Sequence, residues 1–301
     1  MYINGYVKIA LLVVGIVSSV SAKSQENLEK SLLWKVYGNG VKDTSYLYGT
    51  IHAIEKKDFI LTNQVKRTFK ATESLVMEVP LDMDEATKKG LAKKIMYPAG
   101  KSIKNYISEA DYAYYQSYMK DTLKMGIIKV KICDMMQPFF AQSLILMEQL
   151  DNMQSYEKSF DKMAKKKEKL ALETIEQQLA IVTGDSVELQ VAQFIRDLKL
   201  GKLDSKKEFK VMVDLYKAQD LQGLYTYIEK SMSEALTSGD KSGLTREKML
   251  DNRNLNWIPK LEDWMSKKSL FVAVGAGHLA GKNGVIHLLR NKGYKVEPVF
   301  N

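Results

Sequence analysis

Two histidines of this 301-residue chain follow a glycine at the same spacing. His52 comes three residues after Gly49, and His278 comes three residues after Gly275. Each pair closes a short apolar run, and glycine lets the backbone turn sharply where a strand ends. Both imidazoles are therefore expected at the carboxyl ends of strands, where they can bind a metal ion or accept a proton.

Two glutamates occupy equivalent positions. Glu78 follows the apolar run 75–77, and Glu173 follows the run 170–172. Because the carboxyl ends of parallel strands face one edge of a sheet, His52, Glu78, Glu173 and His278 are expected to converge there. Two imidazoles with one or two carboxylates suit manganese, cobalt or zinc, which acidify a bound water and polarise a carbonyl. The alternative is that each group is a helix cap or an ordinary buried polar residue.

A predicted helix at 245–266 carries a second polar group. Arg253 and Asn254 lie on or beside its apolar stripe, and a buried polar group without a partner costs about 1–3 kcal/mol. Arg253 is expected either to clamp the helix to the sheet through Glu78 or Glu173, or to bind a substrate carbonyl or a developing oxyanion. The stripe consists of Leu250, Trp257, Leu261 and Trp264.

The glycines around His278 invite comparison with a dinucleotide-binding loop. Gly275, Gly277 and Gly281 follow a predicted strand, but their spacing is GxGxxxG, and only 20 residues follow Gly281. A dinucleotide half-domain needs more chain than that. We expect no nucleotide cofactor, and Gly275 and Gly277 instead allow the close approach of a ligand.

The elements that must position these residues come from both ends of the chain. Strands are predicted at 32–37, 45–49, 74–79 and 170–173, and the C-terminal region returns to strand, helix and strand over 270–299. The intervening segments are mostly helical, with predicted helices at 62–71, 187–200 and 206–232. The fold class is therefore α/β, with a mixed sheet built from N- and C-terminal segments. A large helical insertion at about 82–169 is expected within a single domain, 23–301.

Composition narrows the classes of function. Hydrophobic residues make up 45% of the chain and charged residues 27%, which is typical of a packed globular protein. The net charge is +9, but basic and acidic residues are interspersed, so solvated helix faces are expected and nucleic acid is not an expected partner. The single cysteine, Cys133, excludes disulfides within the chain and cysteine-ligated zinc sites.

Residues 1–22 have the features of a secretory signal. Lys8 precedes the apolar run 9–17, and Val20-Ser21-Ala22 has the small-x-small pattern of a cleavage site. Cleavage after Ala22 would place the protein in the periplasm or outside the cell, and the alternative is an uncleaved N-terminal anchor. The excess positive charge would then face an anionic envelope surface.

Several of these segments together resemble the TraB/GumN family. They are Leu47–His52, Gly275–Gly281, Gly293–Pro298, Glu78, Leu172–Thr174 with the following Glu176–Leu179, and Arg253-Asn254, within a stretch from Leu32 to Val299. Asn252 departs from the pattern, because the family usually has a glutamate before Arg-Asn.

The resemblance implies an α/β core with a helical insert and distant kinship to the Tiki metalloproteases and the erythromycin esterases. In Tiki proteins the two Gly-x-x-His histidines and the strand-end glutamates are regarded as the site of a divalent-metal peptidase. By that resemblance, His52 and His278 bind the metal with Glu78 or Glu173. The strand-end arrangement and the resemblance together lead us to expect the remaining glutamate as general base and Arg253 as the group that stabilises the oxyanion. Gly49, Asn254, Gly275, Gly277 and Gly281 support them. The alternative function is a non-catalytic envelope protein that binds a peptide or small ligand in the same cleft.

Overall fold

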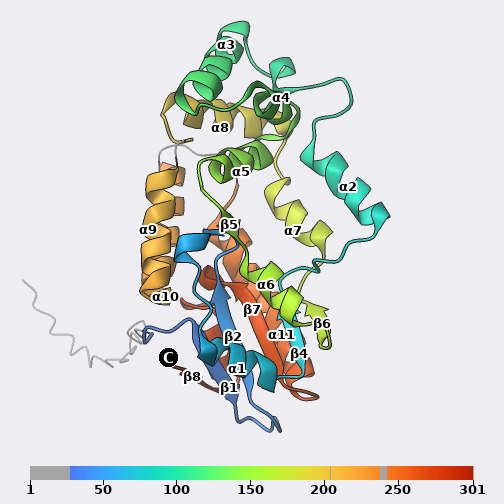
Figure 1. Cartoon of the computed structure of the whole chain (residues 1–301), viewed down its shortest axis with the longest axis vertical. Helices are drawn as coiled ribbons and strands as arrows, with labels where there is room; N and C mark the ends of the chain where they lie inside the picture. Colours follow the sequence, from blue (N-terminus) through green and yellow to red (C-terminus); the bar gives the residue numbers. More distant parts are fainter. Residues whose placement is uncertain (1–27, 204, 238–242, 301) are drawn as a thin grey trace, which may run out of the picture.

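A six-stranded mixed sheet is the centre of the computed structural model, which describes residues 28–203, 205–237 and 243–300 (Figure 1). The strand order is β6-β4-β7-β2-β1-β8. The strands are β1 (Leu33–Tyr37), β2 (Ser45–Thr50), β4 (Ser74–Met77), β6 (Glu168–Ala171), β7 (Leu270–Gly275) and β8 (Lys295–Pro298). The predicted signal segment 1–22 lies outside the described residues.

Four neighbouring strands of this sheet are mutually parallel. β7 pairs in parallel with β2 and β4, and β4 pairs in parallel with β6. In these pairings Thr50 lies opposite Gly275, and Met77 lies opposite both Ala273 and Ala171. The carboxyl ends of the four strands are therefore level with one another. β1 forms an antiparallel hairpin with β2 and also pairs antiparallel with β8.

Aromatic side chains form the core on one face of the sheet. Phe69 on α1 (Asn63–Ala71) and Phe160 on α6 (Tyr156–Met163) both contact the ring of Phe271 on β7. All three side chains are almost completely buried. On the other side, α11 (Asn252–Met265) lies behind the sheet in Figure 1 and buries Trp257 and Leu261. Next to it, α12 (Val285–Asn291) leads into β8.

A second hydrophobic cluster, formed by several of the other helices, lies beyond the sheet at the upper end of the molecule in Figure 1. Tyr115, Ile145 and Phe194 are buried at its centre. The helices of this region are α2 (Glu85–Ile95), α3 (Glu109–Ser117), α4 (Ile127–Met135), α5 (Pro138–Glu148) and α8 (Val187–Lys199), with α7 (Ile175–Val182) between α8 and the sheet.

Two helices near the expected limits of the helical insertion, 82–169, pack in a different cluster from their neighbours in the sequence. α6 lies inside those limits but packs its buried Phe160 on the sheet, whereas α8 lies outside them and buries Phe194 in the second cluster. Both differences follow from where each amphipathic helix finds an apolar partner surface, which its own sequence does not specify.

The predicted helix 206–232 is two helices, α9 (Lys206–Lys217) and α10 (Leu221–Thr237). Gln219 between them has φ of 57°, in the left-handed region, and the Asp220 carboxylate accepts a hydrogen bond from Gly223 N. The chain therefore turns and begins a new helix. In contrast, α11 continues through Pro259.

The remaining elements are short. They are β3 (Ile54–Glu55), β5 (Met153–Gln154), η1 (Lys56–Asp58), η2 (Ile103–Asn105), η3 (Tyr118–Thr122), η4 (Glu247–Asp251) and η5 (Ala276–His278). Among residues 28–203, 205–237 and 243–300, no helix has the length and apolar character needed to cross a membrane.

Candidate functional site

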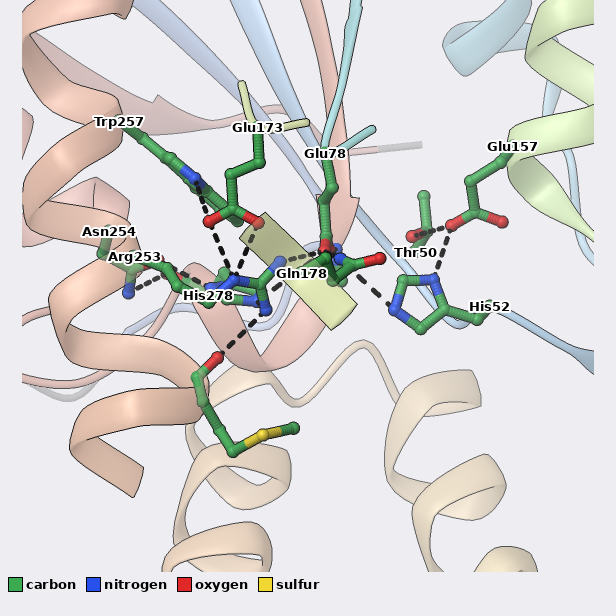
Figure 2. A network of polar contacts seen from close by, with 12 residues as sticks. Thr50, His52, Glu78, Glu157, Glu173, Gln178, Arg253, Asn254, Trp257 and His278 are labelled. Carbon is green, nitrogen blue, oxygen red and sulfur yellow. Dashed lines mark hydrogen bonds and ion pairs between the residues drawn. The ribbon is translucent and has the colours of Figure 1, made fainter. Parts of the chain in front are cut away.

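The four strand-end residues meet at the carboxyl edge of the parallel strands (Figure 2). Glu78 directly follows β4, and Glu173 comes two residues after β6. His52 comes two residues after β2, and His278 ends the short turn η5 that follows β7. The parallel pairing thus brings together residues that lie far apart in the sequence.

Glu78 lies at the centre of the network. Its Oε1 accepts a hydrogen bond from Gly275 N at 2.8 Å and lies 4.0 Å from His52 Nε2 and 3.9 Å from His278 Nε2. Its Oε2 accepts from Arg253 Nη2 at 2.6 Å and from Gln178 Nε2 at 3.1 Å. Burial alone would raise the pKa of Glu78, but the imidazoles, the Arg253 guanidinium and the Gly275 N–H lower it well below the usual range.

The backbone of Gly275 lies between the two histidines. A β-carbon on this residue would lie 3.2 Å from Glu78 Oε1, 3.6 Å from His278 Cδ2 and 3.7 Å from His52 Nε2. All three side chains therefore face the same point above the Gly275 backbone. The space exists because this position lacks a side chain.

Asn254 fixes the orientation and tautomer of His278. The Asn254 Nδ2 group donates to the carbonyl oxygens of His278 and Asn283, so its Oδ1 faces His278 Nδ1 at 2.7 Å. An amide oxygen only accepts, so Nδ1 carries the proton and Nε2 presents its lone pair. That lone pair accepts from Arg253 Nη1 at 3.0 Å.

His278 is buried and neutral. Its ring packs on Trp257 with centroids 4.4 Å apart, and its side chain is only 5% exposed. Burial lowers the pKa of His278 to about 3, although the negative charge of Glu78 acts in the opposite direction. At neutral pH this imidazole is therefore a lone-pair donor rather than a cation.

Arg253 connects the helix to two strands. Its Nε donates to both oxygens of Glu173, at 2.9 and 3.1 Å, and its Nη2 donates to Glu78. Its Nη1 donates to Met249 O at 3.0 Å as well as to His278. Trp257 Nε1 donates to Glu173 Oε1 at 2.9 Å. Arg253 thus pairs with Glu78 and Glu173 together, where the sequence left the choice between them open.

Sequence reasoning missed Glu157. Its Oε1 accepts hydrogen bonds from Thr50 Oγ1 at 2.7 Å and from His52 Nδ1 at 3.1 Å. The local pattern, Ser155 as the cap of α6 with Glu157 in its first turn, predicts a helix start and nothing about His52. The Glu157 hydrogen bond, with help from the charge of Glu78, raises the pKa of His52 to about 9.

Gln178 was also missed as a contact of Glu78, although the stretch that carries it supported the family resemblance. It lies on α7, directly after Gln177, which forms a capping box with Thr174. That capping box was a visible signal for the helix start but did not indicate which way Gln178 points.

The supporting glycines lie where three elements crowd together. A β-carbon on Gly49 would contact Ala276 at 3.2 Å, and one on Gly277 would lie 2.9 Å from Ile228 Cδ1. Gly281 has φ of 87°, and a β-carbon there would lie 2.4 Å from the Tyr225 ring. These residues let β2 and α10 approach the turn that carries His278.

A cleft of about 730 Å³ opens on the Glu173–Arg253 side of the network. The opposite end of the network is His52, whose side chain is 67% exposed. Asn252, the position that departs from the family pattern, lines this cleft. The other lining residues are Leu172, Glu173, Gln177, Ala180, Ile181, Gly184, Asp185, Gly243, Lys248, Arg253, Asn256 and Lys260.

The donor set suits a divalent cation in its chemistry. His52 Nε2 and Glu78 Oε1 lie within 3.7 Å of the β-carbon position of Gly275, and His278 faces that position with its Cδ2 carbon. Across the described ranges, no three His, Cys, Asp or Glu side chains already stand in metal-ligand geometry. At this site Arg253 Nη1 hydrogen-bonds the lone pair that His278 would donate. Coordination by His278 thus requires that one hydrogen bond to be released.

The fold and the site define a class of α/β proteins in which two Gly-x-x-His turns meet a buried glutamate–arginine network. The model of the TraB/PrgY/gumN family matches residues 32–298, and the chain therefore belongs to that family. No curated protein and no solved structure matches the chain.

Proposed function

We propose that this member of the TraB/PrgY/gumN family is an exported metal-dependent hydrolase that cleaves peptide bonds. The single observation that supports this most is the convergence of two imidazoles and one carboxylate around the β-carbon position of Gly275. Such a set of nitrogen and oxygen donors suits manganese, cobalt or zinc.

In this proposal His52, His278 and Glu78 would hold the cation, which requires His52, with its pKa raised to about 9, to lose its Nε2 proton on binding. When bound, the cation supplies Lewis acidity, which lowers the pKa of a water and polarises a carbonyl. Neutral His278 already has its proton on Nδ1, so its Nε2 is the nitrogen available for a ligand bond. Glu78 stays ionised because its pKa is held far below neutrality.

Arg253 is the group we propose for stabilising negative charge on the substrate. It is buried, permanently charged and one of the cleft-lining residues. Glu173 binds Arg253 Nε through both oxygens and also accepts from Trp257. We therefore assign Glu173 to positioning Arg253, instead of the general-base role that the resemblance left open for it.

Metal content tests this proposal directly. Protein purified without chelator is measured for bound manganese, cobalt and zinc, alongside the double variant His52→Ala/His278→Ala. His287→Ala is the matched control, since the chain has three histidines and His287 lies on α12, outside the network. Loss of metal and of peptide hydrolysis in the double variant alone is the expected result. Equal metal content in all three proteins would overturn the metal site.

One observation favours a second function, the binding of a peptide or small ligand without catalysis. Both ring nitrogens of His278 are hydrogen-bonded, which a purely structural imidazole would also show. This alternative predicts that a peptide or small ligand binds in the cleft and is released uncleaved. It also predicts that the wild-type protein contains no metal. Peptide-library incubation followed by mass spectrometry separates the two, because cleavage products appear only if the hydrolase proposal is correct.

A further inference from the structure

We propose that Glu157 is the positioning residue of His52, holding its ring so that Nε2 faces the space above Gly275. This inference rests on the proposed function, in which His52 is a metal ligand. Neither the family match nor the predicted motifs assign Glu157 a role.

The contacts of Glu157 fix its carboxylate on three sides. Thr50 Oγ1 and His52 Nδ1 both donate to Oε1, at 2.7 and 3.1 Å. Ser155 Oγ donates to Oε2 at 2.9 Å. The Glu157 side chain is 15% exposed, whereas the His52 side chain is 67% exposed. The carboxylate is therefore the ordered partner, and it can orient a ring that the surrounding core does not enclose.

The hydrogen bond determines which nitrogen of His52 faces the site. A carboxylate that is ionised only accepts, so Nδ1 donates to Glu157 and carries a proton. Nε2 then points the other way, 4.0 Å from Glu78 Oε1 and 3.7 Å from the β-carbon position of Gly275. Figure 2 shows His52 between Glu157 and Glu78, with one ring nitrogen toward each.

The two histidines of the site are held in the same way by different residues. For His278, the Asn254 amide oxygen binds Nδ1 and leaves Nε2 toward Glu78. For His52, the Glu157 carboxylate binds Nδ1 and leaves Nε2 toward Glu78. Metal-binding histidines commonly donate their second N–H to a carboxylate or carbonyl, which fixes the ring and increases its basicity. Glu157 supplies for the exposed histidine what Asn254 supplies for the buried one.

The fold explains why this partner comes from a distant segment. Thr50 ends β2, and His52 comes two residues later. Glu157 lies in the first turn of α6, a helix that packs on the sheet. The ring of Tyr156, next to Glu157, contacts Tyr48 on β2 with centroids 5.8 Å apart. Packing of α6 on β2 therefore delivers the carboxylate to His52.

The test uses Zn²⁺ as the probe and calorimetric affinity as the first measurement. Wild type is compared with Glu157→Gln, which keeps the shape and one acceptor oxygen, and with Glu157→Ala. We expect Glu157→Ala to weaken zinc binding by about 10–100-fold, with Glu157→Gln in between. Glu55→Gln is the control, because Glu55 on β3 binds Lys57 and Asp151 N, and its substitution should leave zinc affinity unchanged.

The second measurement is proton NMR of the metal-free protein, which needs neither zinc nor substrate. The chain has only three histidines, so imidazole N–H signals can be assigned by substituting each in turn. A downfield Nδ1–H signal of His52 should be present in wild type and lost in Glu157→Ala, with the His278 signal retained. Retention of that signal and of full zinc affinity in Glu157→Ala would overturn the inference.

The two proposals fail in distinguishable ways. If wild type binds no zinc but loses the His52 Nδ1–H signal on Glu157→Ala substitution, the metal site is wrong and the positioning of His52 is supported. If wild type binds zinc through His52 and all the Glu157 variants bind equally, the metal site is supported and the role of Glu157 is wrong. Circular dichroism melting confirms folding, and Glu157→Gln carries the comparison if Glu157→Ala does not fold.

Discussion

At the scale of single residues, the centre of the site is the buried guanidinium of Arg253, which pairs with two carboxylates. Arg253 is 9% exposed and binds Glu78 and Glu173, and the carboxylates are equally buried. Removing one partner of a buried ion pair leaves an uncompensated charge, which is costly. Surface ion pairs in the same sheet, such as Glu168 with Lys268, contribute little because water screens them.

Glu173→Gln should therefore lower the free energy of unfolding by about 3 kcal/mol, at the lower end for buried ion pairs because Glu78 still balances Arg253. Glu168, at the start of β6, is 51% exposed, and Glu168→Gln should change the free energy of unfolding by less than about 1 kcal/mol. Urea denaturation measures both. If the two variants are equally stable, Glu173 is only a residue near a helix start, and its ion pair with Arg253 contributes nothing to stability.

His278 makes stability depend on pH. Its pKa is about 3 in the folded protein and about 6.5 in the unfolded chain, so below pH 6.5 only the unfolded chain takes up this proton. The contribution is present above pH 6.5 and is lost as pH falls toward 3. Between pH 7.5 and 5.0 the loss is about 2 kcal/mol for this group.

His278→Gln removes the titrating group and should reduce this pH dependence between pH 7.5 and 5.0. Denaturation of wild type and variant at the two pH values provides the comparison. His287→Ala is the control and should retain the wild-type dependence. An unchanged pH dependence in His278→Gln would contradict a buried neutral imidazole. Glu78 acts in the same direction at lower pH, because its lowered pKa makes its contribution disappear as pH falls below the ordinary glutamate range.

At the scale of elements, the turn after β7 decides whether the site has room. Gly275 donates its N–H to Glu78 and leaves open the space that the two imidazoles face. Its φ is −52°, which other residues adopt easily, so glycine is required here for space and not for backbone conformation.

Gly275→Ala should accordingly weaken zinc binding by at least about tenfold, as disturbing a ligand's support typically does. The free energy of unfolding should change by less than about 1 kcal/mol, because only the Glu78 carboxylate must shift slightly. Calorimetric zinc titration and urea denaturation measure the two effects. Gly90→Ala, in α2 where a β-carbon meets no atom within 4 Å, is the control. Unchanged zinc affinity in Gly275→Ala would argue against the space above Gly275 as the metal site.

At the scale of the whole molecule, the buried side chains form two separate hydrophobic clusters. The sheet cluster contains Phe271, and the helical cluster contains Phe194, both 1% exposed or less. Elements with separate cores can open separately when one of them is destabilised. The site residues all belong to the sheet end, apart from Gln178 on α7, which leads toward the helical cluster.

Phe194→Ala should therefore lower the protection of amides in α3, α5 and α8 in hydrogen exchange, by an amount corresponding to about 3–5 kcal/mol. Protection in β2, β4 and β7 should remain close to that of wild type. Phe271→Ala, the matched substitution in the other cluster, should lower protection throughout. Equal loss across both clusters in Phe194→Ala would show that the molecule unfolds as one unit.

Local sequence determined the strands of this protein and the polar residues at their carboxyl ends. Apolar runs followed by glycine and histidine, or by glutamate, predicted strands with polar residues at their carboxyl ends, because alternation and turn preferences act over a few neighbouring residues. The parallel order of four strands then placed His52, Glu78, Glu173 and His278 at one edge, as the sequence predicted. The family was also recognisable from these motifs, and the match over 32–298 confirms it.

Only the tertiary structure decided the partners. Glu157 meets His52 across 105 positions, and Gln178 meets Glu78 across 100, with no local pattern that relates them. Arg253 had two candidate carboxylates and pairs with both, because α11 crosses behind the sheet where β4 and β6 end side by side. Helix α8 joined the helical cluster for a similar reason. An amphipathic helix specifies which of its faces is apolar, while the surface that covers this face depends on packing of the entire chain.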